Sequence, residues 1–234
     1  MMREAAGGQS GIGMTSARTR ERLVQRLAEQ GIRDPRVLDR IRDVPRHQFV
    51  DEALASRAYE DTALPIGFGQ TISQPYVVAR MSEAVTVGGT PEKVLEIGTG
   101  CGYQTAVLAP LVGKLYSIER IGPLLDRAKQ RVKELGIRNV RFKHADGADG
   151  WKSQAPFDAI LVAAAPHAVP MKLLEQLKEG GRLVAPIGPE GKQELLRLTR
   201  RGDQYIRERL GFVSFVPLVG GVSKGYAARA DAGS

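Results

Sequence analysis

Residues 94–103, VLEIGTGCGY, contain the side chains and spacing best suited to binding a nucleotide-like ligand. The three alternating glycines let the backbone turn sharply and approach a ligand closely. A helix that begins after them directs free N–H groups toward that ligand. Many nucleotide-binding folds share such a loop, but Glu96 narrows the choice. Its carboxylate would repel a pyrophosphate and suits a ligand with a cationic amino-acid end, so the segment favours S-adenosyl-L-methionine over a dinucleotide.

Two further acids follow at the ends of the next predicted strands. Glu119 closes the run LYSIE about 20 residues beyond the glycine loop, where a carboxylate accepts hydrogen bonds from a ribose diol. Asp146 and Gly147 close the following strand, and an acid there suits the adenine amino group. Alone, each acid fits an ordinary surface position or turn. In series they predict one ligand site, because ligands of open α/β sheets bind at the carboxyl ends of the strands.

An alternation of strands and helices positions these residues. Strands are predicted at 93–97, 114–119, 139–145, 157–164 and 181–187, and helices at 102–112, 122–135 and 169–178. Such alternation predicts an α/β fold with a doubly wound, mostly parallel, Rossmann-like sheet. Strands predicted at 193–200 and 205–219 would add an antiparallel edge.

The segments before this sheet have a different character. Helices are predicted at 17–30, 35–44 and 75–85, whereas residues 63–75 form an apolar, Gly-punctuated loop, which is more often functional than decorative. We expect one domain over 17–234, after a disordered extension at 1–16 and with a flexible tail at 225–234. The expected parts of this domain are an N-terminal part at 17–90, a cofactor-binding core at 91–188 and C-terminal strands at 189–224.

Composition excludes several classes of protein. A single cysteine excludes an internal disulfide framework and a Cys-based zinc site, and none of the three histidines has a neighbour at metal-ligand spacing, so no metal is expected. No apolar run reaches the roughly 18–20 residues that span a membrane, and the N-terminus lacks an apolar signal core, so we expect a cytoplasmic protein. The net charge of +8 could suggest nucleic acid. Because basic residues alternate with acids along the predicted helices and strands, we favour solvated charged faces instead.

The end of the fourth predicted strand, LVAAAPH at 161–167, excludes other methyltransferase chemistries. It lacks the Asn-Pro-Pro-aromatic sequence of DNA methyltransferases that act on exocyclic amines. It also lacks the Pro-Cys nucleophile of methyltransferases that act on a cytosine ring carbon, because the single cysteine, Cys101, lies in the glycine loop.

The sequence resembles the protein-L-isoaspartate (D-aspartate) O-methyltransferase family over nearly all of residues 17–224. The motifs that carry this resemblance are VPRHQFV at 44–50, PIG at 65–67, GQTISQP at 69–75, the glycine loop, Asp146-Gly147 and FVPLV at 215–219. The GQTISQP run is highly specific, whereas the glycine loop indicates only a class I methyltransferase.

The resemblance implies roles for individual residues. Ser73 is the implied active-site residue. The implied cofactor contacts are Gln70, Thr71, Ile72, Glu96, Gly98, Gly100, Cys101, Glu119, Arg120, Asp146 and Gly147. The implied substrate contacts are Ala63, Ile66, Thr71, Ser73 and Val219.

The resemblance also implies an activity. The enzyme would move a methyl group from S-adenosyl-L-methionine to the free α-carboxyl of L-isoaspartyl residues in peptides and proteins, and so begin repair through a succinimide. We expect a monomer with no membrane or nucleic-acid partner. Two alternatives remain at this point: a class I methyltransferase acting on RNA or a small molecule, and a non-catalytic module that keeps the fold.

Overall fold

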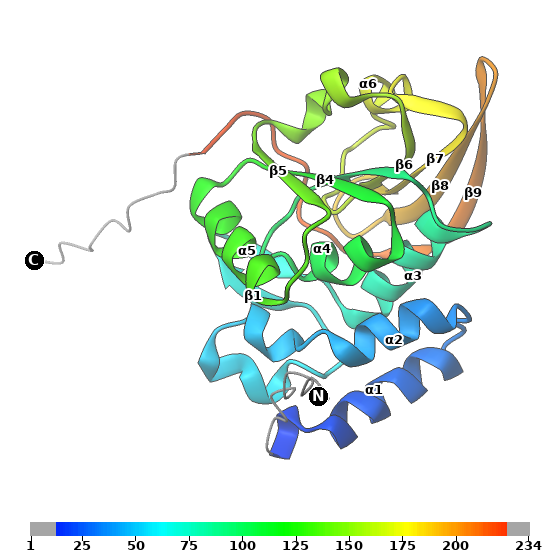
Figure 1. Ribbon diagram of the computed structural model, residues 1–234. Helices are drawn as coiled ribbons and strands as arrows, with labels where there is room; N and C mark the ends of the chain where they lie inside the picture. The colour runs from blue at the N-terminus through cyan, green and yellow to red at the C-terminus, as the bar shows by residue number, and fades with distance from the viewer. Residues whose placement is uncertain (1–12, 224–234) are drawn as a thin grey trace, which may run out of the picture.

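The computed structural model describes residues 13–223, built around a seven-stranded sheet (Figure 1). The strand order is β5-β4-β3-β6-β7-β8-β9. The first five strands in this order pair in parallel, and β8 and β9 extend the sheet antiparallel. The bounds are β3 Lys93–Ile97, β4 Lys114–Glu119, β5 Val140–His144, β6 Phe157–Val162, β7 Leu177–Ile187, β8 Gln193–Arg201 and β9 Gln204–Val213. The predicted fold class is confirmed.

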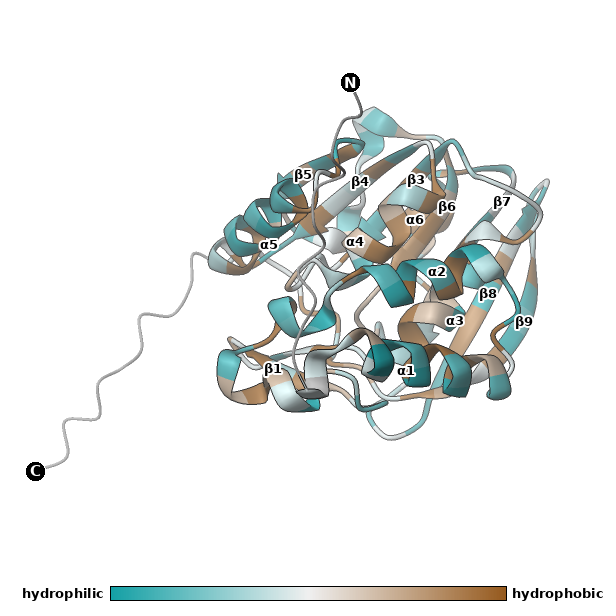
Figure 2. Cartoon of the chain, turned by 60° about the horizontal axis from the view of Figure 1, so that its bottom comes forward, coloured by the Kyte–Doolittle hydropathy of each residue, from teal (hydrophilic) through white to brown (hydrophobic). Residues whose placement is uncertain are grey.

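Helices cover the sheet and add an N-terminal layer (Figure 1). The bounds are α1 Ala17–Glu29, α2 Pro35–Asp43, α3 Pro75–Thr86, α4 Tyr103–Leu108, α5 Gly122–Glu134 and α6 Met171–Leu174. Local signals start the first two helices: Ser16 accepts a hydrogen bond from the Thr19 N–H, and Asp34 accepts one from the Arg36 N–H. Figure 2 shows their outer faces as hydrophilic, and the apolar faces pack inward. Within residues 13–223, no helix is long and apolar enough to cross a membrane.

The N-terminal region differs from the prediction at two places. Residues 1–12 of the expected extension lie outside the described residues, as does the expected tail at 225–234, but Gly13–Thr15 form a 3-10 turn before α1. Residues 63–75, predicted to be irregular, contain the hairpin β1 Leu64–Gly67 and β2 Gln70–Ile72. The turn is possible because Gly67, Phe68 and Gly69 all take positive φ.

The C-terminal half also differs from the prediction. The helix expected at 169–178 is a single turn, α6, and β7 already begins at Leu177, which pairs with Phe157. The strand expected at 205–219 ends at Val213, because Phe215 leaves the ladder and donates its N–H to the Gln193 side chain at 2.6 Å. Residues 215–223 then cross the carboxyl ends of the parallel strands, forming bridges from Pro217 to Ala165 and from Ser223 to Ile121.

Candidate active site

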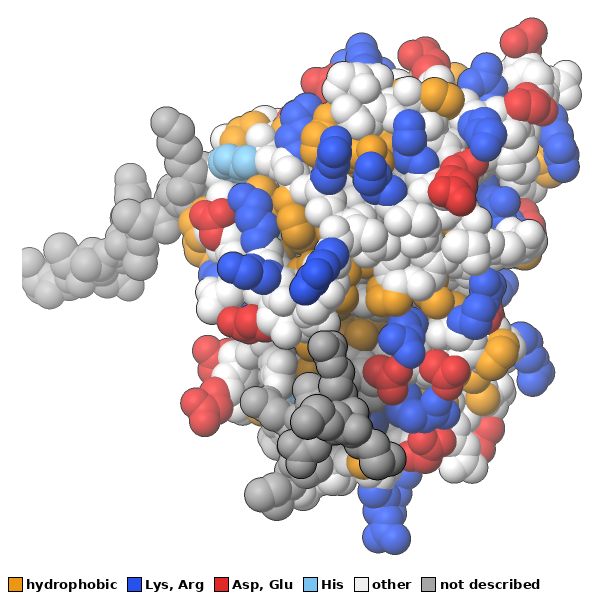
Figure 3. Space-filling view, in the orientation of Figure 1, with side chains coloured by type: hydrophobic (Ala, Val, Ile, Leu, Met, Phe, Trp, Pro, Cys, Tyr) orange, Lys and Arg blue, Asp and Glu red, His pale blue; other side chains and the backbone are white. Residues whose placement is uncertain are grey.

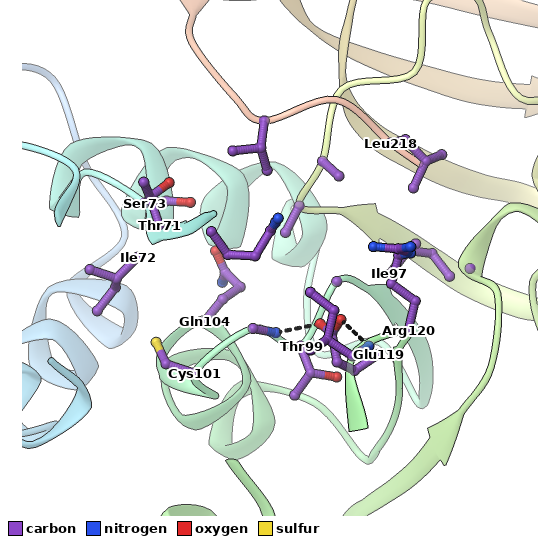
Figure 4. Close-up of a pocket in the computed structure, with 18 of the residues that line it drawn as sticks. Thr71, Ile72, Ser73, Ile97, Thr99, Cys101, Gln104, Glu119, Arg120 and Leu218 are labelled. Atoms are coloured by element: carbon purple, nitrogen blue, oxygen red, sulfur yellow. Dashed lines mark hydrogen bonds between the residues drawn. The ribbon is translucent and has the colours of Figure 1, made fainter. Parts of the chain in front are cut away.

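A cavity opens at the carboxyl ends of β3, β4 and β6, where the acid series predicts a ligand site (Figure 4). It encloses about 830 Å³ of empty space, open solvent at its mouth included. Its walls come from the end of the hairpin, the glycine loop, the end of β4 and the C-terminal segment: Gln70–Ser73, Val78, Ile97–Cys101, Tyr103, Gln104, Ile118–Ile121, Gly147, Ala163, Ala164 and Val216–Val219.

The glycine loop needs its glycines. Gly98, Gly100 and Gly102 have φ of +92°, +55° and +90°, a conformation that side chains rarely adopt. A Cβ at Gly102 would also lie 3.1 Å from the Cβ of Ala128 on α5. Gly102 therefore lets α4 start close to α5, and Gly98 and Gly100 present bare backbone to the cavity.

Glu119 lies on the cavity wall. Its carboxylate accepts hydrogen bonds from the Gly100 N–H at 2.8 Å and from the Ile121 N–H at 2.9 Å. Each carboxylate oxygen has a second acceptor position. Glu119 thus fixes the glycine loop and still has capacity to accept hydroxyl donors from a ligand (Figure 4).

Glu96 lies elsewhere than the sequence suggests. The side chain is fully buried below the loop and is not part of the cavity wall. Its Oε2 accepts hydrogen bonds from the Thr105 and Ser117 hydroxyls, both at 2.6 Å, while its Oε1 has no partner among residues 13–223. Burial raises the pKa of Glu96 to about 7, although the two hydroxyl hydrogen bonds act to lower it. The structure therefore does not place the Glu96 side chain in contact with the ligand cavity.

The sequence predicts that Asp146 and Gly147 both contact the cofactor, but only Gly147 lies on the cavity wall. Gly147 lines the cavity, where a Cβ would lie 2.3 Å from Ile97 Cγ2. Asp146 does not line it. Its carboxylate accepts hydrogen bonds from the Ala148 N–H at 2.9 Å and from the Gly221 N–H at 2.6 Å, and so holds the C-terminal segment across the strand ends.

The hairpin brings Ser73 to the cavity. Gln70, Thr71, Ile72 and Ser73 all line it, and the Ser73 hydroxyl has no hydrogen-bond partner among the described residues. Figure 4 shows Ser73 and Thr71 on the opposite side from Leu218.

Of the remaining predicted site residues, some line the cavity and others do not. Arg120, Cys101 and the half-exposed Val219 also line the cavity, whereas Ala63 and Ile66 do not. Ile66 is buried behind Gly100, with its Cδ1 3.6 Å from where a Cβ of Gly100 would lie.

Several wall residues have no signal in the sequence. Val78 and Gln104 come from α3 and α4, and Gln104 donates to the Ser82 hydroxyl at 3.0 Å. Strand-end position could have indicated Ile97, Ile118 and Ala163, since each lies at or next to the carboxyl end of a strand. Within residues 13–223, no three side chains are grouped as metal ligands. His47, His144 and His167 are not part of the wall.

Known proteins resemble this chain along almost its whole length. The family model described as Protein-L-isoaspartate(D-aspartate) O-methyltransferase (PCMT) matches residues 18–223. The protein-L-isoaspartate O-methyltransferase of Halorhodospira halophila is 62% identical over 91% of this chain and 96% of its own length. The enzyme of the same name from Alcanivorax borkumensis is 62% identical over 91% and 97%.

Solved structures agree with the sequence relatives. One protein-L-isoaspartate O-methyltransferase has a TM-score of 0.78 at 30% identity, covering 87% of this chain and 67% of its own. A second, from Plasmodium falciparum in complex with S-adenosyl-L-homocysteine, has a TM-score of 0.72 at 27% identity, covering 86% and 98%.

Proposed function

The chain belongs to the protein-L-isoaspartate(D-aspartate) O-methyltransferase family, and we propose that it methylates the free α-carboxylate of L-isoaspartyl residues in peptides and proteins, with S-adenosyl-L-methionine as the methyl donor. The observation that carries this proposal is the meeting of two segments in one cavity. The Ser73 segment and the glycine loop belong to different parts of the fold, one before α3 and one after β3, and both form parts of the same wall. Donor and acceptor can therefore be held side by side.

The residues of the cavity fit an adenosyl cofactor. Glu119 offers acceptor positions for a ribose diol, bare backbone at Gly98 and Gly100 allows close approach, and Gly147 lets Ile97 line the wall where any side chain at 147 would collide with it. When bound, the cofactor supplies the methyl group and its own leaving group. The chain therefore has to bind, orient and shield the two reactants.

The acceptor needs no general base. An α-carboxyl titrates near 3–4 and is ionised at neutral pH. This agrees with a cavity wall that has no histidine. We infer that the Ser73 hydroxyl and nearby backbone N–H groups hold the carboxylate in line with the methyl group, since good alignment supplies roughly 7–11 kcal/mol.

Methylation starts a repair sequence outside the enzyme. The ester is a better electrophile than the carboxylate, so the amide nitrogen of the following residue attacks it, methanol leaves and a succinimide forms. Water then opens this ring partly to normal aspartate. These later steps need no residue of this chain.

Arginine pairing favours a protein substrate over RNA. Arg42 pairs with Glu21 and Asp39, and Glu194 pairs with Arg207 and Arg209. Figure 3 likewise shows red side chains among the blue ones near α1 and α2. We keep cytoplasmic location, a monomeric state and little affinity for nucleic acid as parts of this proposal.

Paired peptides test the proposal. Two peptides of identical composition, one with an isoaspartyl and one with a normal aspartyl residue, are incubated with labelled S-adenosyl-L-methionine. We expect label in base-labile methyl ester on the isoaspartyl peptide alone. Equal labelling of both peptides, or labelling of neither, would refute the assignment, and labelling of added RNA instead would favour the RNA alternative.

A further inference from the structure

Asp61 lies outside the cavity, between the 3-10 helix Glu52–Arg57 and β1, and its carboxylate is the meeting point of three hydrogen bonds. Oδ1 accepts from the Tyr76 N–H at 2.9 Å. Oδ2 accepts from the side-chain amides of Gln74 at 3.0 Å and Gln30 at 3.2 Å. Two of the three donors belong to residues that follow Ser73 within three positions.

The contact with Tyr76 replaces a missing local cap. The N-cap residue of α3 is Gln74, whose side chain makes no capping hydrogen bond, and Pro75 at the first helical position has no N–H. The Tyr76 N–H is therefore one of the free donors at the helix start. Asp61 satisfies it from another segment, with its negative charge at the favourable end of the helix dipole.

Arg46 anchors the segment that carries Asp61. Its fully buried guanidinium donates from Nε to the Ala58 carbonyl at 2.8 Å and from Nη2 to the Thr62 carbonyl at 3.2 Å. The same guanidinium carbon lies 4.8 Å from the ring centroid of Tyr103. Tyr103 lines the cavity and begins α4 directly after the glycine loop. Residues 58–62 are thus fixed relative to the cofactor side of the cavity.

These contacts hold the hairpin at both ends. Arg46 fixes its entry at Thr62, and Asp61 fixes its exit at Gln74 and Tyr76. The Ser73 hydroxyl has no partner of its own in the described part of the chain, so its position depends on its backbone. We propose that Asp61 is a positioning residue that sets Ser73 against the methyl donor, an inference that rests on the proposed function.

Three variants separate positioning from general stability. Asp61→Ala removes all three hydrogen bonds, and we expect kcat for the isoaspartyl peptide to fall about 10- to 100-fold, the scale of a misplacement near 1 Å. Affinity for S-adenosyl-L-homocysteine should stay within about threefold of wild type, since Asp61 does not line the cavity. Asp61→Asn should keep kcat within about threefold of wild type, because its amide oxygen accepts from the Tyr76 N–H and its NH2 group can donate to the Gln74 and Gln30 amide oxygens once those side-chain amides turn over.

Asp34→Ala is the matched control. Asp34 also caps a helix, accepting from the Arg36 N–H at 2.9 Å at the start of α2, so its loss costs stability of the same kind. It lies away from the cavity wall, and wild-type kcat is expected. Equal kcat in Asp61→Ala and Asp34→Ala would overturn the positioning role, as would a failure of Asp61→Asn to rescue.

Amide hydrogen exchange gives a readout that does not depend on activity. We expect faster exchange of residues 70–80 in Asp61→Ala and unchanged exchange there in Asp34→Ala, since the freed Tyr76 N–H lies at the start of α3. Unchanged exchange of this segment in Asp61→Ala would overturn the inference, even if wild type proved inactive on isoaspartyl peptides and the proposed function itself failed.

A milder pair covers the case in which Asp61→Ala does not fold. Gln74→Ala removes one hydrogen bond to Asp61, and Gln25→Ala removes a surface one to Glu29 at 3.1 Å. The positioning role predicts a lower kcat in Gln74→Ala only. Equal kcat in the two variants would contradict it.

Discussion

At the scale of single residues, Ser73 is the group whose function is tested most directly. Its hydroxyl reaches the cavity and has no hydrogen bond to a base within residues 13–223, so it can orient a carboxylate but is not activated as a nucleophile. A hydrogen bond to a charged group contributes about 1.5–3 kcal/mol. We therefore predict that Ser73→Ala lowers methyl transfer about 10- to 100-fold and leaves binding of S-adenosyl-L-homocysteine, measured by calorimetry, nearly unchanged. Wild-type turnover in this variant would show that the orienting role is wrong.

Glu96 should give the protein a measurable pH dependence. Below its ordinary pKa of 4.5 the group is protonated in both states; between 4.5 and about 7 it ionises in the unfolded chain but stays protonated in the fold. The free energy of unfolding should therefore fall as pH rises through this window, by about 3 kcal/mol, and then level off.

Glu96→Gln removes this titration and keeps an oxygen acceptor for Ser117 and Thr105. Urea unfolding of both proteins from pH 4.5 to 7.5 is the measurement. We expect the variant to gain about 3 kcal/mol relative to wild type across the window. Parallel stability curves would mean that Glu96 has no raised pKa.

Side-chain direction decides which of the predicted site residues lie on the cavity wall. The end of a strand indicates which edge of the sheet a residue occupies, and this placed Glu119 on the cavity wall. It does not indicate whether the side chain points to the ligand or into the interior. Glu96 lies within β3, where Val94 to Ile97 are buried, so its carboxylate turned to neighbouring hydroxyls instead. Asp146 likewise turned to backbone donors, one of them 75 residues away along the chain.

At the scale of elements, the contact between α4 and α5 depends on Gly102. It combines φ of +90° with a position where a Cβ would lie 3.1 Å from the Cβ and 3.3 Å from the Cα of Ala128. Gly102→Ala should cost about 1–2 kcal/mol for the left-handed backbone and a further 1–3 kcal/mol for the collision. It should also weaken cofactor binding, because the glycine loop would shift.

Gly136→Ala is the control for this prediction. Gly136 has φ of +71° but nothing within 4 Å of an added Cβ, so only the backbone cost applies. Urea denaturation of both variants measures the difference, and equal losses of stability would show that the close approach of α4 to α5 has no energetic consequence.

Elements with a clear hydrophobic pattern were predicted well, whereas elements defined by contacts between residues far apart in the sequence were not. The alternation from β3 to β6 has apolar runs bounded by turn signals, and its strands lie where the sequence places them. The hairpin at 64–72 has only three to four residues in each strand, too few for a visible period. The sequence predicts Leu177 within the helix 169–178, but in the structure it pairs with Phe157 and belongs to β7. No local sequence pattern indicates this pairing.

At the scale of the whole molecule, the cavity connects three parts of the chain. Its wall takes residues 70–73 and 78 from the N-terminal part, residues 97–101, 103, 104, 118–121, 147, 163 and 164 from the sheet core, and residues 216–219 from the C-terminal segment. A ligand bound there stabilises the folded arrangement of all three at once. The single domain expected over 17–234 can be tested on this basis.

Calorimetry in the presence of S-adenosyl-L-homocysteine provides that test. At a ligand concentration 100 times Kd the free energy of unfolding should rise by about 2.7 kcal/mol. For a chain of this size this corresponds to a Tm increase of about 5–11 °C. If the three parts unfold as one unit, a single transition should move as a whole. Two transitions, only one of which shifts with the ligand, would show that part of the wall unfolds on its own and that the cavity joins units of separate stability.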